Sequence, residues 1–116
     1  MGRLTTHVLD TARGKPAAGV RIELDRIAKD GERQRLAVAT TNADGRADAP
    51  LLDVAAFRSG EYELAFYIGD YFRALTTMQS TPFLDVVPVR FIISDDAHYH
   101  VPLLVTPWSY ATYRGS

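Results

Sequence analysis

The chain has 116 residues, of which 47% are hydrophobic, and it contains no cysteine. This size predicts a single domain over residues 1–116 that builds its core without metal or disulfide support. The absence of cysteine excludes disulfides, thiol nucleophiles and thiolate metal sites. The formal net charge is -1. The chain therefore lacks the excess of basic residues found in nucleic-acid-binding proteins, and we expect no nucleic-acid partner.

The N-terminal segment has no apolar leader, and no stretch of the sequence approaches the roughly 18 apolar residues of a membrane-spanning helix. We therefore expect no membrane partner. The cytoplasm is the expected location by default.

Turn residues separate short runs rich in Val, Ile, Leu, Tyr, Phe and Thr along most of the chain. This spacing is typical of an all-β sandwich or barrel. Residues 49–58 are too mixed to assign. The expected strands cover residues 4–10, 20–27, 33–41, 61–69, 87–93, 99–105 and 109–113.

The first expected strand, residues 4–10, has a period of two. Successive side chains of a strand point to opposite faces of the sheet. Thr6 and Val8 therefore share one face, and Thr5 and His7 share the other.

Residues 20–27 and 33–41 read as a hairpin that turns at Gly31. The first of these strands alternates apolar and charged residues, as expected when one face is buried. In the return strand we expect Leu36 and Val38 to face the core.

One short helix is expected from Asp70 to Gln79. The Asp70 side chain can cap its N-terminus, and Phe72 and Leu75 fall at helical spacing with Met78 or Gln79. The helix is an isolated element in a chain of strands.

Histidine is the most informative residue type in this chain. His98 and His100 lie two apart on one expected strand, so both imidazoles face the same way. Each of these histidines is either a partly buried residue with hydrogen-bond partners or a functional group. The same two interpretations apply to His7, which lies on another expected strand. Two imidazoles need further ligands to hold a metal, and no motif supplies them, so we expect no metal site. Arg46 is either a solvated residue or a clamp for an anion or carbonyl.

Several motifs are spread along the whole chain: Leu4 to Thr11, Gly14-Lys15-Pro16-Ala17, Thr41 to Arg46, His98 to Leu104, Ser109-Tyr110 and the ending Tyr113-Arg114-Gly115-Ser116. Together they resemble those of one known family, the transthyretin-related 5-hydroxyisourate hydrolases. The hormone carriers called transthyretins share the fold of this family, but they have lysine, glutamate and threonine at the positions of His7, Arg46 and His100, and they lack the tail.

The resemblance implies a transthyretin-like two-sheet β-sandwich of about eight strands with one short helix. It also implies a homotetramer, a dimer of dimers, with active sites in a channel between dimers. The family's small-molecule substrate is 5-hydroxyisourate, which it hydrolyses to 2-oxo-4-hydroxy-4-carboxy-5-ureidoimidazoline in urate catabolism. No cofactor is used.

The resemblance also implies which residues form the site. Ring-opening hydrolysis needs a base, a group that stabilises the oxyanion, and an acid for the leaving nitrogen. Either His7 or His100 is expected to activate water, while Arg46 and Arg114 bind oxygens and developing negative charge. The full expected set is His7, Arg46, His100 and Ser116 for catalysis, and His7, Arg46, Tyr113, Arg114 and Gly115 for substrate binding.

The tail residues have distinct expected roles. Tyr113 closes the channel, Gly115 allows the tail to bend, and Ser116 offers its hydroxyl and terminal carboxylate. Two other classes of function remain open from sequence, because a fold does not determine function. One is a carrier of small aromatic ligands, and the other is a structural or adhesive β-sandwich.

Overall fold

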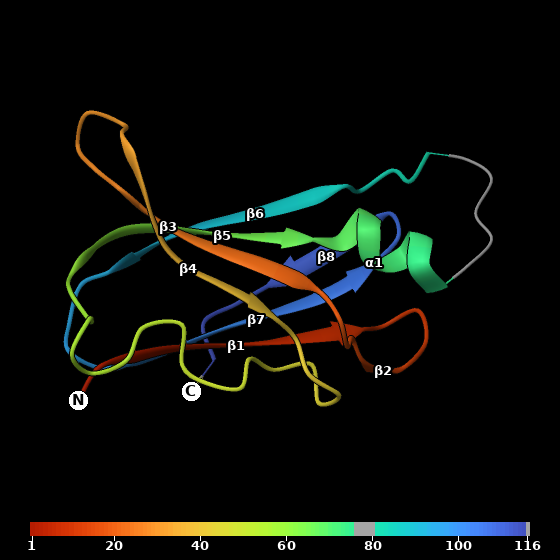
Figure 1. Ribbon diagram of the computed structural model, residues 1–116, viewed down its shortest axis with the longest axis horizontal. Helices are drawn as coiled ribbons and strands as arrows, with labels where there is room; N and C mark the ends of the chain where they lie inside the picture. The colour runs from red at the N-terminus through yellow and green to blue at the C-terminus, as the bar shows by residue number, and fades with distance from the viewer. Residues whose placement is uncertain (76–80, 116) are drawn as a thin grey trace.

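The computed structural model describes residues 1–75 and 81–115. The elements are β1 (Arg3–Asp10), β2 (Lys15–Pro16), β3 (Arg21–Ile27), β4 (Arg33–Thr40), β5 (Gly60–Tyr67), α1 (Ile68–Leu75), β6 (Val86–Ile93), β7 (His98–Thr106) and β8 (Ser109–Thr112). Figure 1 shows two layers. One layer is a four-stranded sheet with the strand order β2-β1-β7-β8, and the other is a four-stranded sheet with the order β4-β3-β5-β6. The all-β sandwich with a short helix is therefore confirmed. Within the described residues, no helix is long and apolar enough to cross a membrane.

The helix differs in its bounds from the sequence prediction. It begins at Ile68, directly after β5, and Asp70 lies in its first turn instead of capping it. Its buried face includes Ile68 and Phe72, so packing against the sandwich decides where the strand turns into helix. The expected end at Gln79 lies outside the described residues.

β1 and β7 form a parallel pair at the centre of their sheet. On β1, Leu4 and Val8 are fully buried between the two sheets, whereas Thr5 and His7 are half-buried on the outer face. The predicted alternation of this strand is confirmed. The outer face of β1 therefore carries the polar side chains of interest.

The predicted facing of β4 is wrong. Leu36 and Val38 are 37% and 49% exposed, and the partners of the inward-facing Ile22 and Leu24 on β3 are alanines of β4. The pairing shifts after Leu24, which leaves Leu36 as an extra residue of β4. The strand does alternate over these residues, but Ala37 and Ala39 pack against the core, while Leu36 and Val38 share the outer face.

The long connection from β4 to β5 runs beside β1, along the lower edge of the view in Figure 1. The Leu4 backbone N–H donates to the Leu52 carbonyl at 3.0 Å, and the Leu51 N–H donates to the Leu4 carbonyl at 2.8 Å. Leu51 and Leu52 are buried. The connection is therefore attached to β1 by backbone hydrogen bonds and apolar contacts.

A buried polar pair joins α1 to the other layer. The Tyr71 hydroxyl donates to Oδ2 of Asp10 at 2.8 Å, and Asp10 has no exposed surface. Oδ1 of Asp10 accepts from the backbone N–H groups of Ala12 and Arg13. Burial, followed by the hydrogen bond to Asp10, raises the pKa of Tyr71 to about 12.

We predict that Tyr71→Phe lowers the free energy of unfolding by about 1–3 kcal/mol near pH 8, because a buried carboxylate oxygen loses its donor. The folded-state pKa of Tyr71 is raised from 10.0, so its contribution is complete below that pH and is lost as the pH rises toward about 12. Urea titrations at several pH values measure both effects. Tyr110→Phe serves as the control, because Tyr110 is 46% exposed. An equal effect of the two substitutions contradicts the prediction.

Candidate active site

The register of the β1–β7 pair brings three polar side chains to one place on the outer face. Thr5 lies opposite His100, and His98 lies two residues earlier on the same face of β7. The Thr5 hydroxyl oxygen is 2.7 Å from Nε2 of His98 and 2.8 Å from Nδ1 of His100. The site therefore contains a hydroxyl group between two imidazoles.

Asn42 organises the loop that carries Arg46. Its Oδ1 accepts from the backbone N–H groups of Asp44 at 2.9 Å and of Arg46 at 3.2 Å. Its Nδ2 donates to Oδ1 of Asp48 at 2.9 Å. Gly45 has a φ of 75°, a left-handed conformation that favours glycine. These contacts fix the backbone conformation of the loop at Arg46.

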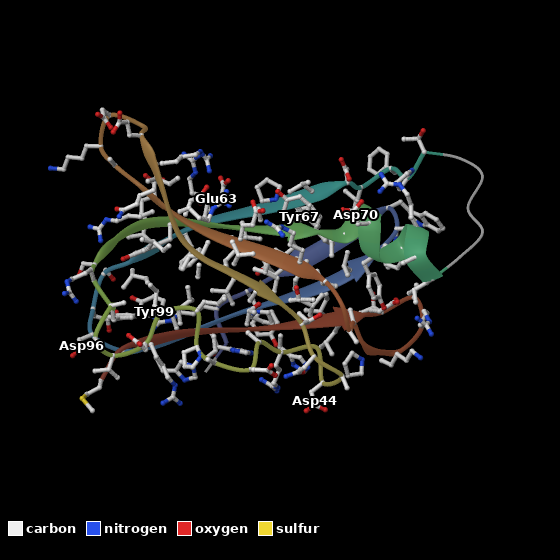
Figure 2. The ribbon with its side chains drawn as sticks, in the orientation of Figure 1. Asp44, Glu63, Tyr67, Asp70, Asp96 and Tyr99 are labelled. Carbon is white, nitrogen blue, oxygen red and sulfur yellow. The ribbon has the colours of Figure 1, made fainter. Side chains whose placement is uncertain are left out.

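The Arg46 loop is also attached to β1. The Val8 N–H donates to the Gly45 carbonyl at 2.8 Å, and a Cβ at Gly45 would lie 2.4 Å from the Val8 carbonyl oxygen. Nε2 of His7 lies 2.8 Å from the carbonyl oxygen of Asp44, which Figure 2 labels on this loop. Because a carbonyl oxygen only accepts, Nε2 of His7 carries a proton and donates it.

These elements enclose a cavity of about 390 Å³ on the outer face of the sheet. Its walls combine residues of β1, β7 and the loop after β4, so Arg46 and His100 line the same space. His7 stands beside this cavity and does not line it. The polar lining consists mainly of Arg3, Thr5, Arg46, Asp48, His98 and His100.

Both cavity histidines have lowered pKa values. Burial lowers the pKa of His100 most, and the charges of Arg46, His98 and His7 lower it further. Burial and the charge of Arg3 lower the pKa of His98. Since each starts from 6.5, both imidazoles are neutral at neutral pH. A neutral imidazole can accept a proton from a nucleophile.

The C-terminal tail meets the site at Gly115. The Gly115 N–H donates to the carbonyl of His100 at 2.7 Å. A Cβ at this position would lie 2.7 Å from Cδ2 of His100, closer than carbon atoms approach one another. The absence of a side chain at Gly115 is therefore what allows the tail to pass beside His100.

Tyr113 and Arg114 line another cavity, of about 240 Å³, at the edge of the sandwich between β6 and β8. The Arg114 guanidinium carbon lies 4.0 Å from the centre of the Tyr99 ring, a cation–π contact. Tyr99 faces the space between the sheets, opposite to His100. Within one chain, Arg114 and Arg46 therefore line different cavities. Ser116 lies outside the described residues.

The structure adds site residues that the sequence did not single out. The alternation of β1 places Thr5 on the same face as His7, and this alternation was the one signal in the sequence that could have identified Thr5 as a site residue. The pairing of Thr5 with His100 requires the parallel register, which no local pattern encodes. Asn42 and Asp48 carried no separate signal in the sequence. Within residues 1–75 and 81–115, no group of at least three His, Cys, Asp or Glu side chains is arranged to hold a metal ion.

Comparisons with known proteins agree with this fold. The curated 5-hydroxyisourate hydrolase of Deinococcus radiodurans is 57% identical over 114 residues, which cover 97% of this chain and 95% of the relative. The structure of Klebsiella pneumoniae 5-hydroxyisourate hydrolase aligns with a TM-score of 0.82 at 34% identity and covers 100% of both chains.

A crystal structure of (S)-allantoin synthase aligns with a TM-score of 0.91 at 47% identity. The alignment covers 99% of this chain and 44% of that chain, so the present chain spans less than half of that longer protein. The model of the HIUase/Transthyretin family matches residues 4–115. Because this match covers nearly the whole chain and the relatives are highly identical to it, the chain belongs to the HIUase/transthyretin family.

Proposed function

We propose that this protein opens the ring of 5-hydroxyisourate by hydrolysis, giving 2-oxo-4-hydroxy-4-carboxy-5-ureidoimidazoline in urate catabolism. The observation that carries the proposal is the cavity in which His100 and Arg46 meet. The names and high identity of the relatives support the same assignment. The protein is thus an enzyme, a hydroxyisourate hydrolase, for which we expect no cofactor.

The residues of the cavity fit the steps of this reaction. Because Nδ1 of His100 contacts Thr5, Nε2 is the ring nitrogen that can meet water or substrate. A neutral imidazole takes a proton from water, and the resulting hydroxide adds to the ring carbonyl. Arg46 carries a permanent charge and planar donors that stabilise the oxyanion. Protonation of the leaving nitrogen then opens the ring.

The geometry favours His100 over His7 as the base. His100 lines the cavity, whereas Nε2 of His7 donates to the Asp44 carbonyl. This bond ties His7 to the loop that carries Arg46. We propose that His7 contributes to catalysis by holding that loop beside the cavity.

The tail is proposed to complete the substrate site. The hydrogen bond between Gly115 and His100 supports this role. For Arg114 to bind substrate beside Arg46, its guanidinium must leave Tyr99, or a second subunit must bring the two cavities together. Tyr113 is proposed to close the site, and Ser116 to supply its hydroxyl or carboxylate.

We propose that the protein assembles as a homotetramer, a dimer of dimers, in the cytoplasm. β6 and β8 are edge strands of their sheets, and such edges pair readily with other strands. Exposed apolar side chains occur at both ends of these edges: Ile92, near the end of β6, is 68% exposed, and Trp108, in the turn between β7 and β8, is 69% exposed. Burial of this surface between copies would join the sheets of neighbouring subunits.

We predict that His100→Ala lowers the turnover of freshly generated 5-hydroxyisourate by about 100- to 10,000-fold, because a positioned base contributes this much. His7→Ala should lower turnover by about 100-fold, because the loop that carries Arg46 loses its hydrogen bond to His7 and a small displacement of a positioning group costs this much. The loss of the substrate's near-ultraviolet absorbance measures the rate. Arg73→Ala, on the exposed side of α1, is the control and should keep normal turnover. Near-normal activity in either histidine variant removes that residue from the mechanism, and no acceleration by the wild type overturns the hydrolase assignment.

We predict that deletion of residues 113–116 leaves a folded sandwich without hydrolase activity, because these residues contribute little to the core. Gly115→Ala should also reduce turnover, since its Cβ would displace the tail or the His100 ring. Thermal unfolding and the absorbance assay together measure both variants. Full activity of the truncated protein would show that the tail has no part in the chemistry.

We predict a tetramer in sedimentation-velocity experiments, and smaller species for Ile92→Asp. The introduced charge would be desolvated on the β6 edge if that edge is an interface. Val38→Asp is the matched control, because Val38 is 49% exposed on β4, at the other edge of the same sheet. A monomeric wild type, or equal effects of the two substitutions, contradicts this assembly.

A further inference from the structure

The hydroxyl group of Thr5 is shared between two imidazoles. Its oxygen lies 2.7 Å from Nε2 of His98 and 2.8 Å from Nδ1 of His100, and both distances are those of hydrogen bonds. The imidazole ring centres are 6.2 Å apart. The two rings therefore lie close to each other, and the Thr5 oxygen links a nitrogen of one to a nitrogen of the other.

Counting protons restricts how these three groups can be arranged. A threonine hydroxyl has one hydrogen, so it donates to one ring nitrogen and accepts from the other. In one arrangement His98 donates and His100 accepts, which leaves the proton of neutral His100 on Nε2. In the other, His100 donates from Nδ1 and His98 accepts, which leaves Nε2 of His100 with a free lone pair.

The charges of the cavity favour the second arrangement. Arg3 and Arg46 line the cavity together with His100, and both guanidiniums are permanently positive. A lone pair directed into such a cavity is favoured over an N–H group, which would present further positive charge. The Asp48 carboxylate also lines the cavity, but its Oδ1 already accepts from Asn42 at 2.9 Å.

We propose that Thr5 and His98 are positioning residues that hold the proton of His100 on Nδ1, so that Nε2 acts as the base, and that they form a relay for that proton. This inference rests on the proposed hydrolysis, in which His100 activates water. It assigns roles to two residues outside the expected catalytic set. The roles follow from the direction of two hydrogen bonds.

The relay balances over a reaction cycle. Nε2 of His100 takes a proton from water, whose hydroxide adds to the substrate carbonyl. The Nδ1 proton then moves to the Thr5 oxygen as the Thr5 hydrogen moves to Nε2 of His98, so that the positive charge rests on His98. When Nε2 of His100 gives its proton to the leaving nitrogen, the relay runs backward and restores the starting state.

The relay also moves positive charge away from Arg46. The groups that face His100 are His7 and Arg3 from β1, Arg46 and Asp48 from the loop, and His98 from β7. The charge of Arg46 lowers the pKa of His100 after burial, so an imidazolium at this position is disfavoured. Transfer of the proton to His98 relieves the repulsion by Arg46, while Arg3, whose charge lowers the pKa of His98, keeps the transfer reversible.

The first test determines which ring nitrogen of His100 carries the proton in the resting enzyme. With ¹⁵N-labelled histidine, two-dimensional NMR distinguishes the protonated nitrogen of His100 from the unprotonated one. The expected wild-type pattern has the proton on Nδ1, and Thr5→Val should shift the population toward Nε2. A wild-type His100 with its proton on Nε2, or an unchanged pattern in Thr5→Val, overturns the proposal.

The second test is kinetic. Thr5→Val should lower kcat by about 10- to 100-fold, by analogy with the loss seen when the partner that orients a metal-ligating histidine is removed, with KM changed much less. Thr5→Ser should restore most of kcat because it returns the hydroxyl. Thr11→Val is the matched control, since Thr11 donates from the end of β1 to the Val105 carbonyl of β7 at 3.2 Å without contacting a histidine. Wild-type kcat in Thr5→Val, or no recovery in Thr5→Ser, contradicts the relay.

His98→Gln separates positioning from proton uptake. The glutamine amide can accept from the Thr5 hydroxyl but cannot take up a proton at neutral pH. We expect it to keep the Nδ1 proton of His100 in the NMR experiment and yet to lower kcat by about 10-fold or more. Normal kcat in this variant excludes the relay. Because NMR needs no turnover, failure of the wild type to hydrolyse 5-hydroxyisourate would be recognised separately, as failure of the proposed function.

Discussion

The parallel register of β1 and β7 links the core to the site. It places Thr5 opposite His100 and Val8 opposite Leu103. Val8 and Leu103 have no exposed surface, and burial of each such side chain stabilises the fold by roughly 1.5–3 kcal/mol. A slip of one residue would turn the apolar set of β1 outward and its polar set inward. The packing of the core therefore holds the Thr5 hydroxyl against the two histidines, although no core residue takes part in the chemistry.

The two sheets use their outer faces differently. On the sheet of β3 and β5, Glu63 and Tyr67, labelled in Figure 2, belong to a network of acidic and basic side chains. The Arg33 guanidinium donates to Glu63 at 2.8 Å, and this hydrogen bond is the largest of the effects that lower the pKa of Glu63. Such exposed pairs contribute about 0–1 kcal/mol each. On the sheet of β1 and β7, by contrast, neutral imidazoles and two arginines line a cavity. This face has the composition needed to bind an electron-rich ring and to accept a proton from water.

Local patterns predicted much of the fold because each depends on neighbouring residues only. The period of two along residues 4–10 placed Thr5 and His7 on one face, and the same period placed His98 and His100 together. The facing of Leu36 and Val38 was wrong because the register with β3 turns Ala37 and Ala39 toward the core instead. The helix begins at Ile68 and not at Asp70, because burial of its first turn outweighs the capping preference. Both errors arise where long-range packing overrides a local signal.

The sequence by itself determined the class of fold, the alternation of the main strands and, through its motifs, the resemblance to the hydrolases that the family match confirms. It also pointed to Arg46, His7, His100 and the tail as candidates. Only the tertiary structure decided that Thr5 joins His98 to His100, that His7 donates to the Arg46 loop, and that Arg114 lies over Tyr99. The physical reason is that these contacts join segments as much as 95 residues apart. Their geometry depends on strand register and on a shared core, and neither can be read from the residues on one side of the contact.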